Sequence, residues 1–139
     1  MKDFVTGATG FIGSEVARRL RERGDEVVAR VRNPAKAPAL KQIGCRLIEG
    51  KVTDAAAVRE GIKGCDAVIH GAAIYEIGIP KSRRPEMYAS SVEGTRTVLG
   101  AALELKIPKV VYIATVNAFG NTEGKIVDET HQHSEKYVS

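Results

Sequence analysis

Apolar and polar positions follow two patterns along the chain, one typical of buried strands and one typical of helices. Short apolar runs rich in β-branched residues predict strands over residues 2–6, 26–31, 46–49, 66–70 and 109–115. The longer segments between these runs predict helices over residues 11–23, 35–43, 55–62 and 86–106. In the first helix Ile12, Val16 and Leu20 recur every four residues, so they form the stripe expected to face the core.

Charged residues add detail to the helices. Glu15 and Arg19, like Arg18 and Glu22, stand four positions apart, which places each pair side by side on the exposed face of the first helix. Asp54 stands immediately before the helix over 55–62 and is the expected N-terminal cap. These signals agree with the apolar pattern on where the helices lie.

The order of elements predicts the fold class. Strands and helices alternate throughout residues 1–139, which indicates one α/β domain with a parallel sheet covered on both faces. Right-handed crossovers lead to a Rossmann-type, doubly wound sheet with strand order 3-2-1-4-5. We expect the sheet to lack the last strands of a complete fold of this type.

Composition narrows the class of protein. The chain is 43% hydrophobic and 27% charged, as expected of a globular domain. No apolar run approaches the roughly 18 residues of a bilayer span, and the first residues do not form a secretory signal, so a cytoplasmic location is expected. The net charge is +4, but the basic residues are scattered among acidic ones and Trp is absent, so we expect no nucleic-acid partner.

Neither cysteines nor histidines suggest a metal site. Cys45 and Cys65 have no partner at metal-ligand spacing, and His70, His131 and His133 do not complete a cluster. We therefore expect free, buried thiols and no bound metal.

A glycine-rich turn between the first strand and first helix carries the main functional signal. Gly7, Gly10 and Gly13 follow the spacing GxxGxxG. In this context the first glycine permits the turn, the second lets a pyrophosphate approach the backbone, and the third lets the helix pack closely on the sheet. The residues predicted to hold a dinucleotide pyrophosphate are Gly7, Thr9, Gly10, Phe11, Ile12 and Gly13.

The end of the second strand bears on the choice of dinucleotide. An acid about twenty residues after the glycines would bind the adenosine ribose, but Val31 occupies that position and is flanked by Arg30 and Arg32. Arginines there suit a 2′-phosphate, so NADP is favoured over NAD. The alternative is that both arginines are surface residues with no ligand.

The segment TGATGFIG resembles the extended branch of the short-chain dehydrogenase/reductase superfamily, which includes sugar epimerases, dehydratases and dihydroflavonol-reductase-like enzymes. The resemblance places Val52 against the adenine, although Lys51 replaces an acid usual in that segment. It also places Ala72 and Ala73 beside the cofactor ribose. Ser91 stands where the family has an asparagine on the long helix.

The same resemblance implies chemistry at the end of the fifth strand. Thr115 takes the place of the family's catalytic hydroxyl, which polarises the substrate oxygen for hydride transfer. The family also needs a YxxxK motif, and the chain stops at Ser139 before one can be completed from Tyr137. We therefore expect the active tyrosine beyond Ser139, and read Tyr137 as not catalytic.

Two functions follow from these observations. The first is an NAD(P)-dependent oxidoreductase or epimerase/dehydratase acting on a small-molecule substrate, of which this chain supplies the dinucleotide-binding part. The second is a non-catalytic module that binds dinucleotide and signals to a partner. Family members often dimerise through a helix that matches residues 86–106, so a homodimer is a further expectation.

Overall fold

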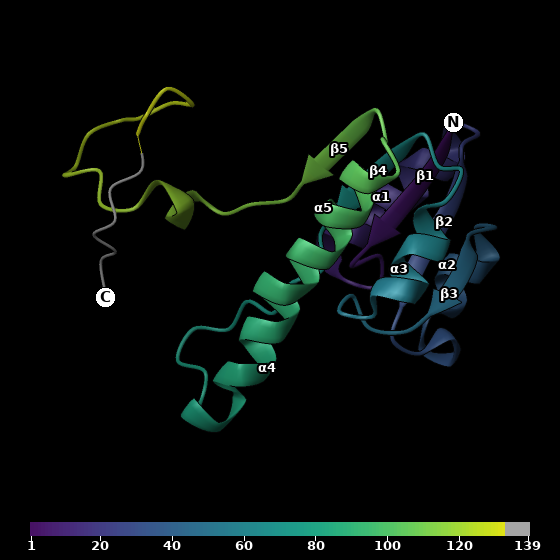
Figure 1. Ribbon diagram of the computed structural model, residues 1–139, viewed down its shortest axis with the longest axis horizontal. Coiled ribbons are helices and arrows are strands. Elements are labelled where there is room, and N and C mark those ends of the chain that lie inside the picture. Colours follow the sequence, from purple (N-terminus) through teal and green to yellow (C-terminus); the bar gives the residue numbers. More distant parts are fainter. Residues whose placement is uncertain (133–139) are drawn as a thin grey trace.

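A five-stranded parallel sheet forms the centre of the computed structural model, which describes residues 1–132 (Figure 1). The strands are β1 (Lys2–Thr6), β2 (Glu26–Val31), β3 (Arg46–Glu49), β4 (Ala67–His70) and β5 (Lys109–Tyr112). They lie in the order β3-β2-β1-β4-β5, and every neighbouring pair is parallel. The predicted fold class and strand order are confirmed.

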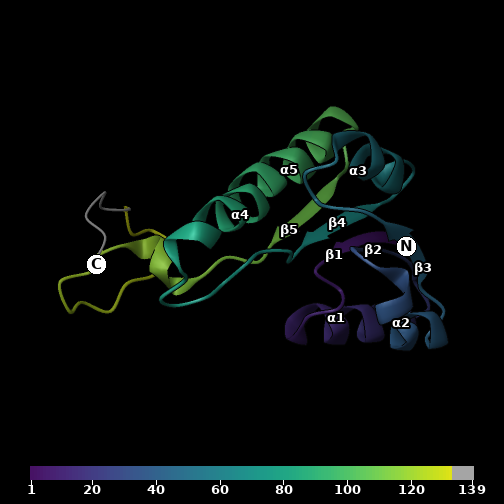
Figure 2. The same ribbon diagram turned by 90° about the horizontal axis from the view of Figure 1, so that it is seen from below.

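Helices cover both faces of this sheet. They are α1 (Phe11–Glu22), α2 (Pro38–Gln42), α3 (Ala55–Ile62), α4 (Arg84–Tyr88) and α5 (Gly94–Glu104). Figure 2 shows α1 and α2 on one face and α3 and α5 on the other. Successive strand residues point to opposite faces, so Phe4 packs in the cluster beneath α3 and α5, whereas Val5 packs in the cluster beneath α1 and α2.

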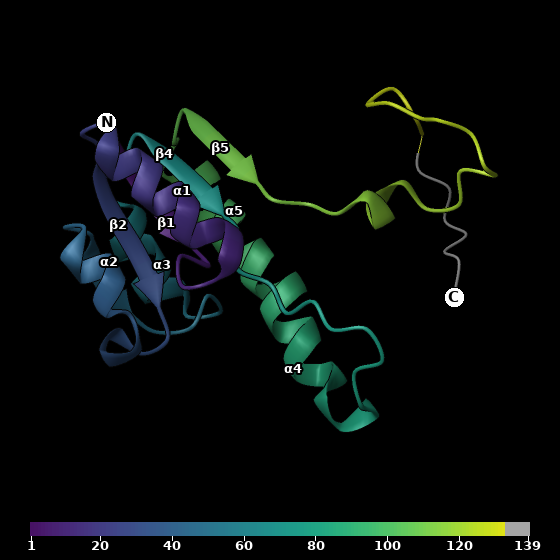
Figure 3. The same cartoon turned by 180° about the vertical axis from the view of Figure 1, so that it is seen from behind.

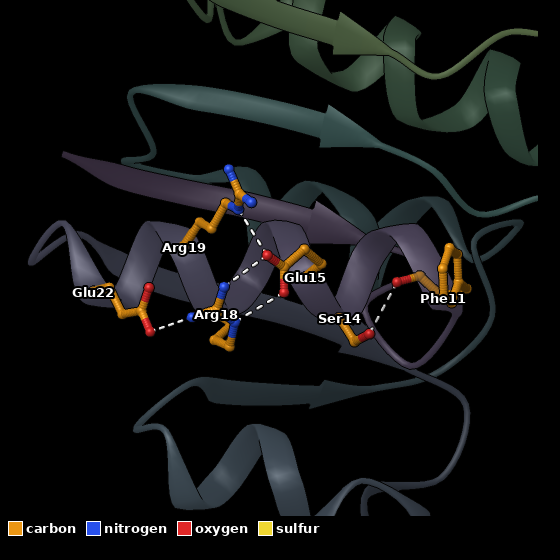
Figure 4. A network of polar contacts seen from close by, with 6 residues as sticks. All are labelled: Phe11, Ser14, Glu15, Arg18, Arg19 and Glu22. Atoms are coloured by element: carbon orange, nitrogen blue, oxygen red, sulfur yellow. Dashed lines mark hydrogen bonds and ion pairs between the residues drawn. The ribbon is translucent and has the colours of Figure 1, made fainter.

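The exposed face of α1 carries a network of ion pairs (Figure 4). The predicted pairs of Arg19 with Glu15, at 2.7 Å, and of Arg18 with Glu22 are present, and Arg18 also pairs with Glu15. The two arginines hold the pKa of Glu15 at about 2. Because these groups are solvated, their pairing contributes little to stability, but it fixes the polar side of α1.

Two predicted helices are divided differently in the structure. The helix expected over 35–43 divides into a 3₁₀ turn, Pro34–Lys36, and α2, because Ala37 precedes a proline and leaves the helical region with φ −126° and ψ 45°. The helix expected over 86–106 begins earlier, at Arg84, and joins α4 to α5 through a π-helical turn, Ala89–Glu93. The combined helix extends well past the sheet (Figure 1).

The fifth strand is shorter than expected. It ends at Tyr112 rather than Thr115, because its partner β4 ends at His70 and the register pairs these two residues. Val111 is 55% exposed, and Figure 3 shows that the chain after β5 leaves the sheet. Tyr137 and His133 lie outside the described residues.

Both cysteines are free and buried. Cys65 precedes β4, and its Sγ lies 3.4 Å from the carbonyl oxygen of Gly61, while Cys45 precedes β3. Burial raises the pKa of Cys65 to about 11 and also raises the pKa of Cys45. The expected buried thiols are therefore confirmed.

Candidate functional site

A cavity of about 430 Å³ opens at the carboxyl ends of the central strands. It lies where the strand order reverses around β1, which is the usual ligand position in an open α/β sheet. The residues that line it come from the turns after β1, β2, β3 and β4 and from the start of the long helix: Gly7, Thr9, Gly10, Arg30, Val31, Arg32, Gly50, Lys51, Val52, Thr53, Gly71, Ala72, Ala73, Ile74, Glu86, Ala89 and Ser90.

The glycine turn forms one wall of this cavity. Gly7 has φ +74°, and a Cβ there would lie 2.7 Å from the backbone of Gly71. A Cβ on Gly13 would lie 2.1 Å from the carbonyl oxygen of Gly7, so only glycine allows α1 to start this close to β1. The cap residue Gly10 offers no side chain, and the first turn holds no acid, so the first amides of α1 fit an anion such as a pyrophosphate.

The structure separates the predicted pyrophosphate residues into three groups. Gly7, Thr9 and Gly10 line the cavity. Phe11 and Ile12 do not line it, and they are 96% and 55% exposed, but their backbone amides belong to the first turn of α1. Gly13 is buried behind the turn, so its contribution is the close packing of α1.

Arg30 has a different role from the one expected from the sequence. Its side chain is 1% exposed, and its guanidinium nitrogens donate to the carbonyl oxygens of Glu49 and Lys51, each at 2.9 Å. Burial lowers the pKa of Arg30, while Asp54 at 3.9 Å opposes this shift. The guanidinium therefore ties β2 to the end of β3 and the turn after it, where a Cβ on Gly50 would collide with it, and Arg30 also lines the main cavity.

Arg32 is exposed and borders both the main cavity and a smaller one beside it. The smaller cavity, of about 380 Å³, is lined by Thr9, Arg32, Asn33 and Lys36. Lys36 is a second cation that the sequence reasoning missed. Its position four residues after Arg32, in a turn that begins with Asn33-Pro34, is the signal that could have found it.

Two further walls contain the residues that were expected beside the adenine and the ribose. Val52 lines the cavity and packs on α5, since a Cβ on Gly94 would lie 2.5 Å from it. Ala72 and Ala73 line the cavity in the turn after β4. The small side chains leave the backbone of that turn accessible to a ligand.

Hydroxyl groups hold the turn after β4 in place. The Ala72 amide donates to Thr6 Oγ1 at 3.2 Å. The Ile74 amide donates to Ser91 Oγ at 3.2 Å, and that hydroxyl lies 3.3 Å from the Ile74 carbonyl oxygen. Ser91 thus bridges the long helix to the turn at the position where the family has asparagine.

His70 lies between the hydroxyls of Thr6 and Thr95 and was not predicted as a site residue. It is fully buried, with Nδ1 2.6 Å from Thr6 Oγ1 and Nε2 3.0 Å from Thr95 Oγ1. The Tyr112 ring stacks on the imidazole with ring centroids 5.6 Å apart. Burial lowers the pKa of His70 to about 4, so the imidazole is neutral at physiological pH.

Thr115 does not line the cavity. It is exposed after the end of β5, where its Oγ1 accepts a hydrogen bond from the Asn117 amide at 3.3 Å. Within residues 1–132, no cluster of three His, Cys, Asp or Glu side chains could hold a metal ion. Over the same range no helix combines the length and apolar character of a membrane span.

Comparisons with known proteins agree with this geometry. The sequence matches the model of the NAD dependent epimerase/dehydratase family over residues 4–138. It is 34% identical over 130 residues to a putative dihydroflavonol 4-reductase of Synechocystis sp., covering 93% of this chain and 37% of that protein. It is 35% identical over 137 residues to cinnamoyl-CoA reductase 1 of Oryza sativa subsp. japonica, covering 91% of this chain and 39% of that protein.

A solved structure extends the comparison to three dimensions. A short-chain dehydrogenase/reductase superfamily protein from Agrobacterium tumefaciens, with bound NAD, superimposes with a TM-score of 0.80 at 27% identity. The alignment covers 96% of this chain and 39% of that chain. The chain therefore spans well under half the length of these relatives.

Proposed function

Because the chain belongs to the NAD-dependent epimerase/dehydratase family, we propose that it supplies the dinucleotide-binding part of an oxidoreductase or epimerase/dehydratase that transfers hydride at a carbonyl or carbinol carbon. The observation that carries the proposal is the cavity beside the uncapped start of α1. The NAD bound in the A. tumefaciens structure supports a nicotinamide dinucleotide as the cofactor.

Each wall of the cavity has a task in this proposal. The backbone around Gly7 and Gly10 holds the pyrophosphate, Val52 packs on the adenine, and the Ala72–Ala73 backbone lies against a ribose. The nicotinamide, when bound, supplies the hydride donor or acceptor. Thr115 orients the substrate oxygen by a hydrogen bond, which requires its segment to approach the cavity.

Binding is tested by titrating the 139-residue chain with NADPH and NADH and following cofactor fluorescence. Gly10→Glu places a carboxylate where the pyrophosphate is proposed, so affinity falls about 100-fold. Gly100→Glu adds the same group at an open position on α5 and leaves affinity unchanged. Equal losses in both variants, or no dinucleotide binding by the wild-type chain, contradict the proposal.

The preference for NADP is a second part of the proposal and rests on Arg32 and Lys36. Both cations border the smaller cavity beside Thr9, where a 2′-phosphate can make charge-assisted hydrogen bonds. Arg32→Ala is expected to raise the Kd for NADPH about 10- to 100-fold while changing the Kd for NADH less than about twofold. Arg46→Ala, at another exposed arginine, is the control, and an unchanged NADPH-to-NADH ratio in Arg32→Ala contradicts this assignment.

A non-catalytic dinucleotide-binding module is the second candidate. The position of Thr115 favours it, because that hydroxyl lies outside the cavity and is hydrogen-bonded to the Asn117 amide. Turnover by the complete protein, of which this chain is proposed to supply the dinucleotide-binding part, separates the candidates: NADPH oxidation with a panel of aldehydes and ketones supports the oxidoreductase, and its loss in Thr115→Val supports the role of that hydroxyl. Tight binding without oxidation supports the module.

A further inference from the structure

His70 lies next to the proposed cofactor cavity but does not line it, and its surroundings assign its protonation state. Thr95 Oγ1 donates its single proton to the Ser91 carbonyl oxygen at 2.7 Å. It can therefore only accept from His70 Nε2, which lies 3.0 Å away. Nε2 must carry a hydrogen.

The other ring nitrogen leads to the same tautomer independently. Thr6 Oγ1 accepts the Ala72 amide at 3.2 Å and lies 2.6 Å from His70 Nδ1. If Nδ1 is bare, the Thr6 hydroxyl donates to it and every proton of the chain has an acceptor. If Nδ1 carried a hydrogen, the Thr6 hydroxyl would accept twice and its own proton would lose this acceptor.

The result is a hydrogen-bond chain that runs in one direction, from the Ala72 amide through Thr6, His70 and Thr95 to the Ser91 carbonyl. Its first donor belongs to the cavity wall, and its last acceptor lies in the π-helical turn that also supplies Ser90 to that wall. Gly71 lies between His70 and Ala72, which both belong to this hydrogen-bond chain. A Cβ on Gly7 would lie 2.7 Å from the Gly71 backbone, so the two turns are closely packed.

We propose that His70 is a positioning residue, whose neutral Nε2–H imidazole holds the Gly71–Ala72 turn against Gly7 so that the cavity keeps the shape a dinucleotide needs. This inference rests on the proposed function for its consequence in binding. Its structural part, the tautomer and the anchored Ala72 amide, holds without any ligand.

The first test examines the hydrogen-bond chain directly in the ligand-free protein. A long-range proton–nitrogen correlation spectrum is expected to show His70 as the Nε2–H tautomer, and hydrogen exchange is expected to show a protected Ala72 amide. Thr6→Val removes the hydroxyl at nearly constant volume, so Ala72 exchange accelerates at least about tenfold, whereas Thr6→Ser restores protection. An Nδ1–H tautomer, or unchanged Ala72 protection in Thr6→Val, overturns the inference.

The second test reads the consequence for binding. Thr95→Val removes the acceptor for Nε2–H and is expected to raise the Kd for NADPH about 5- to 10-fold. Thr97→Val is the matched control, because the Thr97 hydroxyl makes the same type of bond on α5, to the Glu93 carbonyl oxygen at 2.9 Å, without contacting His70. Equal Kd values for the two variants overturn the positioning role.

Failure of the proposed function looks different from failure of this inference. If the wild-type protein binds no dinucleotide, the proposed function fails. The spectrum and the Ala72 exchange rate then still decide whether the hydrogen-bond chain exists. If either variant does not fold, the wild-type tautomer alone decides, since only Nε2–H fits the one-way chain.

Discussion

At the scale of single residues, the buried imidazole of His70 makes stability depend on pH. The folded-state pKa is lowered from 6.5 to about 4 by burial, so between these values the unfolded chain binds a proton that the folded chain does not. The contribution of His70 to the free energy of unfolding is therefore complete above pH 6.5 and is lost as the pH falls toward 4. We expect His70 to account for a loss of about 2 kcal/mol between pH 7 and pH 5.

The measurement is urea unfolding at both pH values for the wild-type chain and for His70→Gln. Gln keeps an amide donor but cannot titrate, so the variant is expected to lack this part of the pH dependence. Both proteins have the same carboxylates, so the effect of carboxylate titration on stability cancels in the comparison. The same loss of stability in both chains would show that His70 is not the cause.

The two arginines around Val31 show why the role of a single residue could not be predicted from the sequence. Arg30 and Arg32 both looked like phosphate ligands, but Arg30 lies inside β2, where it donates to the carbonyl oxygens of Glu49 and Lys51, whereas Arg32 follows the end of β2 and is exposed. Those carbonyls lie 19 and 21 residues away in the sequence, so nothing local to Arg30 predicted them. His70 was missed for the same reason, because its partners Thr6 and Thr95 come from distant segments.

At the scale of elements, the start of α1 depends on a single missing side chain. Gly13→Ala would place a Cβ 2.1 Å from the Gly7 carbonyl oxygen, so α1 must move away from β1. We expect this change to lower the free energy of unfolding by about 2–3 kcal/mol and to abolish dinucleotide binding.

Gly100→Ala is the matched control for this prediction. Gly100 lies inside α5 with open space around a Cβ, so alanine there is expected to raise the free energy of unfolding by about 0.5–1 kcal/mol through its helix propensity. Urea unfolding of both variants tests the pair. A stabilising Gly13→Ala would refute the close approach of α1 to β1.

Element boundaries were predictable where a local residue sets them. The predicted bounds of β2, β3 and α3 are confirmed, because Asp54 caps α3 through the Ala57 amide and glycines or prolines border the others. The end of β5 was not predictable, because it follows from where β4 stops. The π-helical turn was missed because its wider winding leaves no clear mark in the apolar pattern.

At the scale of the whole molecule, β4 is the one strand that pairs with β5 within residues 1–132, and an apolar surface lies beside β5. Val111 is paired in register with Ile69, which packs in the cluster beneath α1 and α2, yet α1 does not reach over β5 (Figure 3). An unpaired edge with apolar residues is a template for association. We expect the 139-residue chain to self-associate at high concentration through this edge.

Sedimentation equilibrium tests this expectation. Val111→Lys should weaken association at least about tenfold, because the charge must be buried against a second chain. Ile126→Lys adds the same charge at a fully exposed apolar position outside β5 and should leave association unchanged. A monomeric wild-type chain, or equal effects of the two variants, would contradict the role of the β5 edge.

The family and the sheet topology were predictable because they rest on local signals repeated along the chain, above all TGATGFIG and the alternation of strands with helices. Both are confirmed by the family match and the strand order. The walls of the cavity were partly predictable, since strand ends meet at one edge of a parallel sheet. The place of Thr115 relative to that edge was not, because β5 ends three residues before it.

The labelling rates of the two buried thiols can report where the folded protein opens. A thiolate attacks a disulfide reagent and displaces the reagent's leaving thiolate. Both Cys45 and Cys65 are buried and have raised pKa values, so the folded chain should resist labelling. Cys65 belongs to the core beneath α3 and α5, and Cys45 to the core beneath α1 and α2. If the two cores open together, both thiols are labelled at one rate and NADPH slows both rates equally. If α2 alone separates from the sheet, Cys45 is labelled first and NADPH does not slow its labelling.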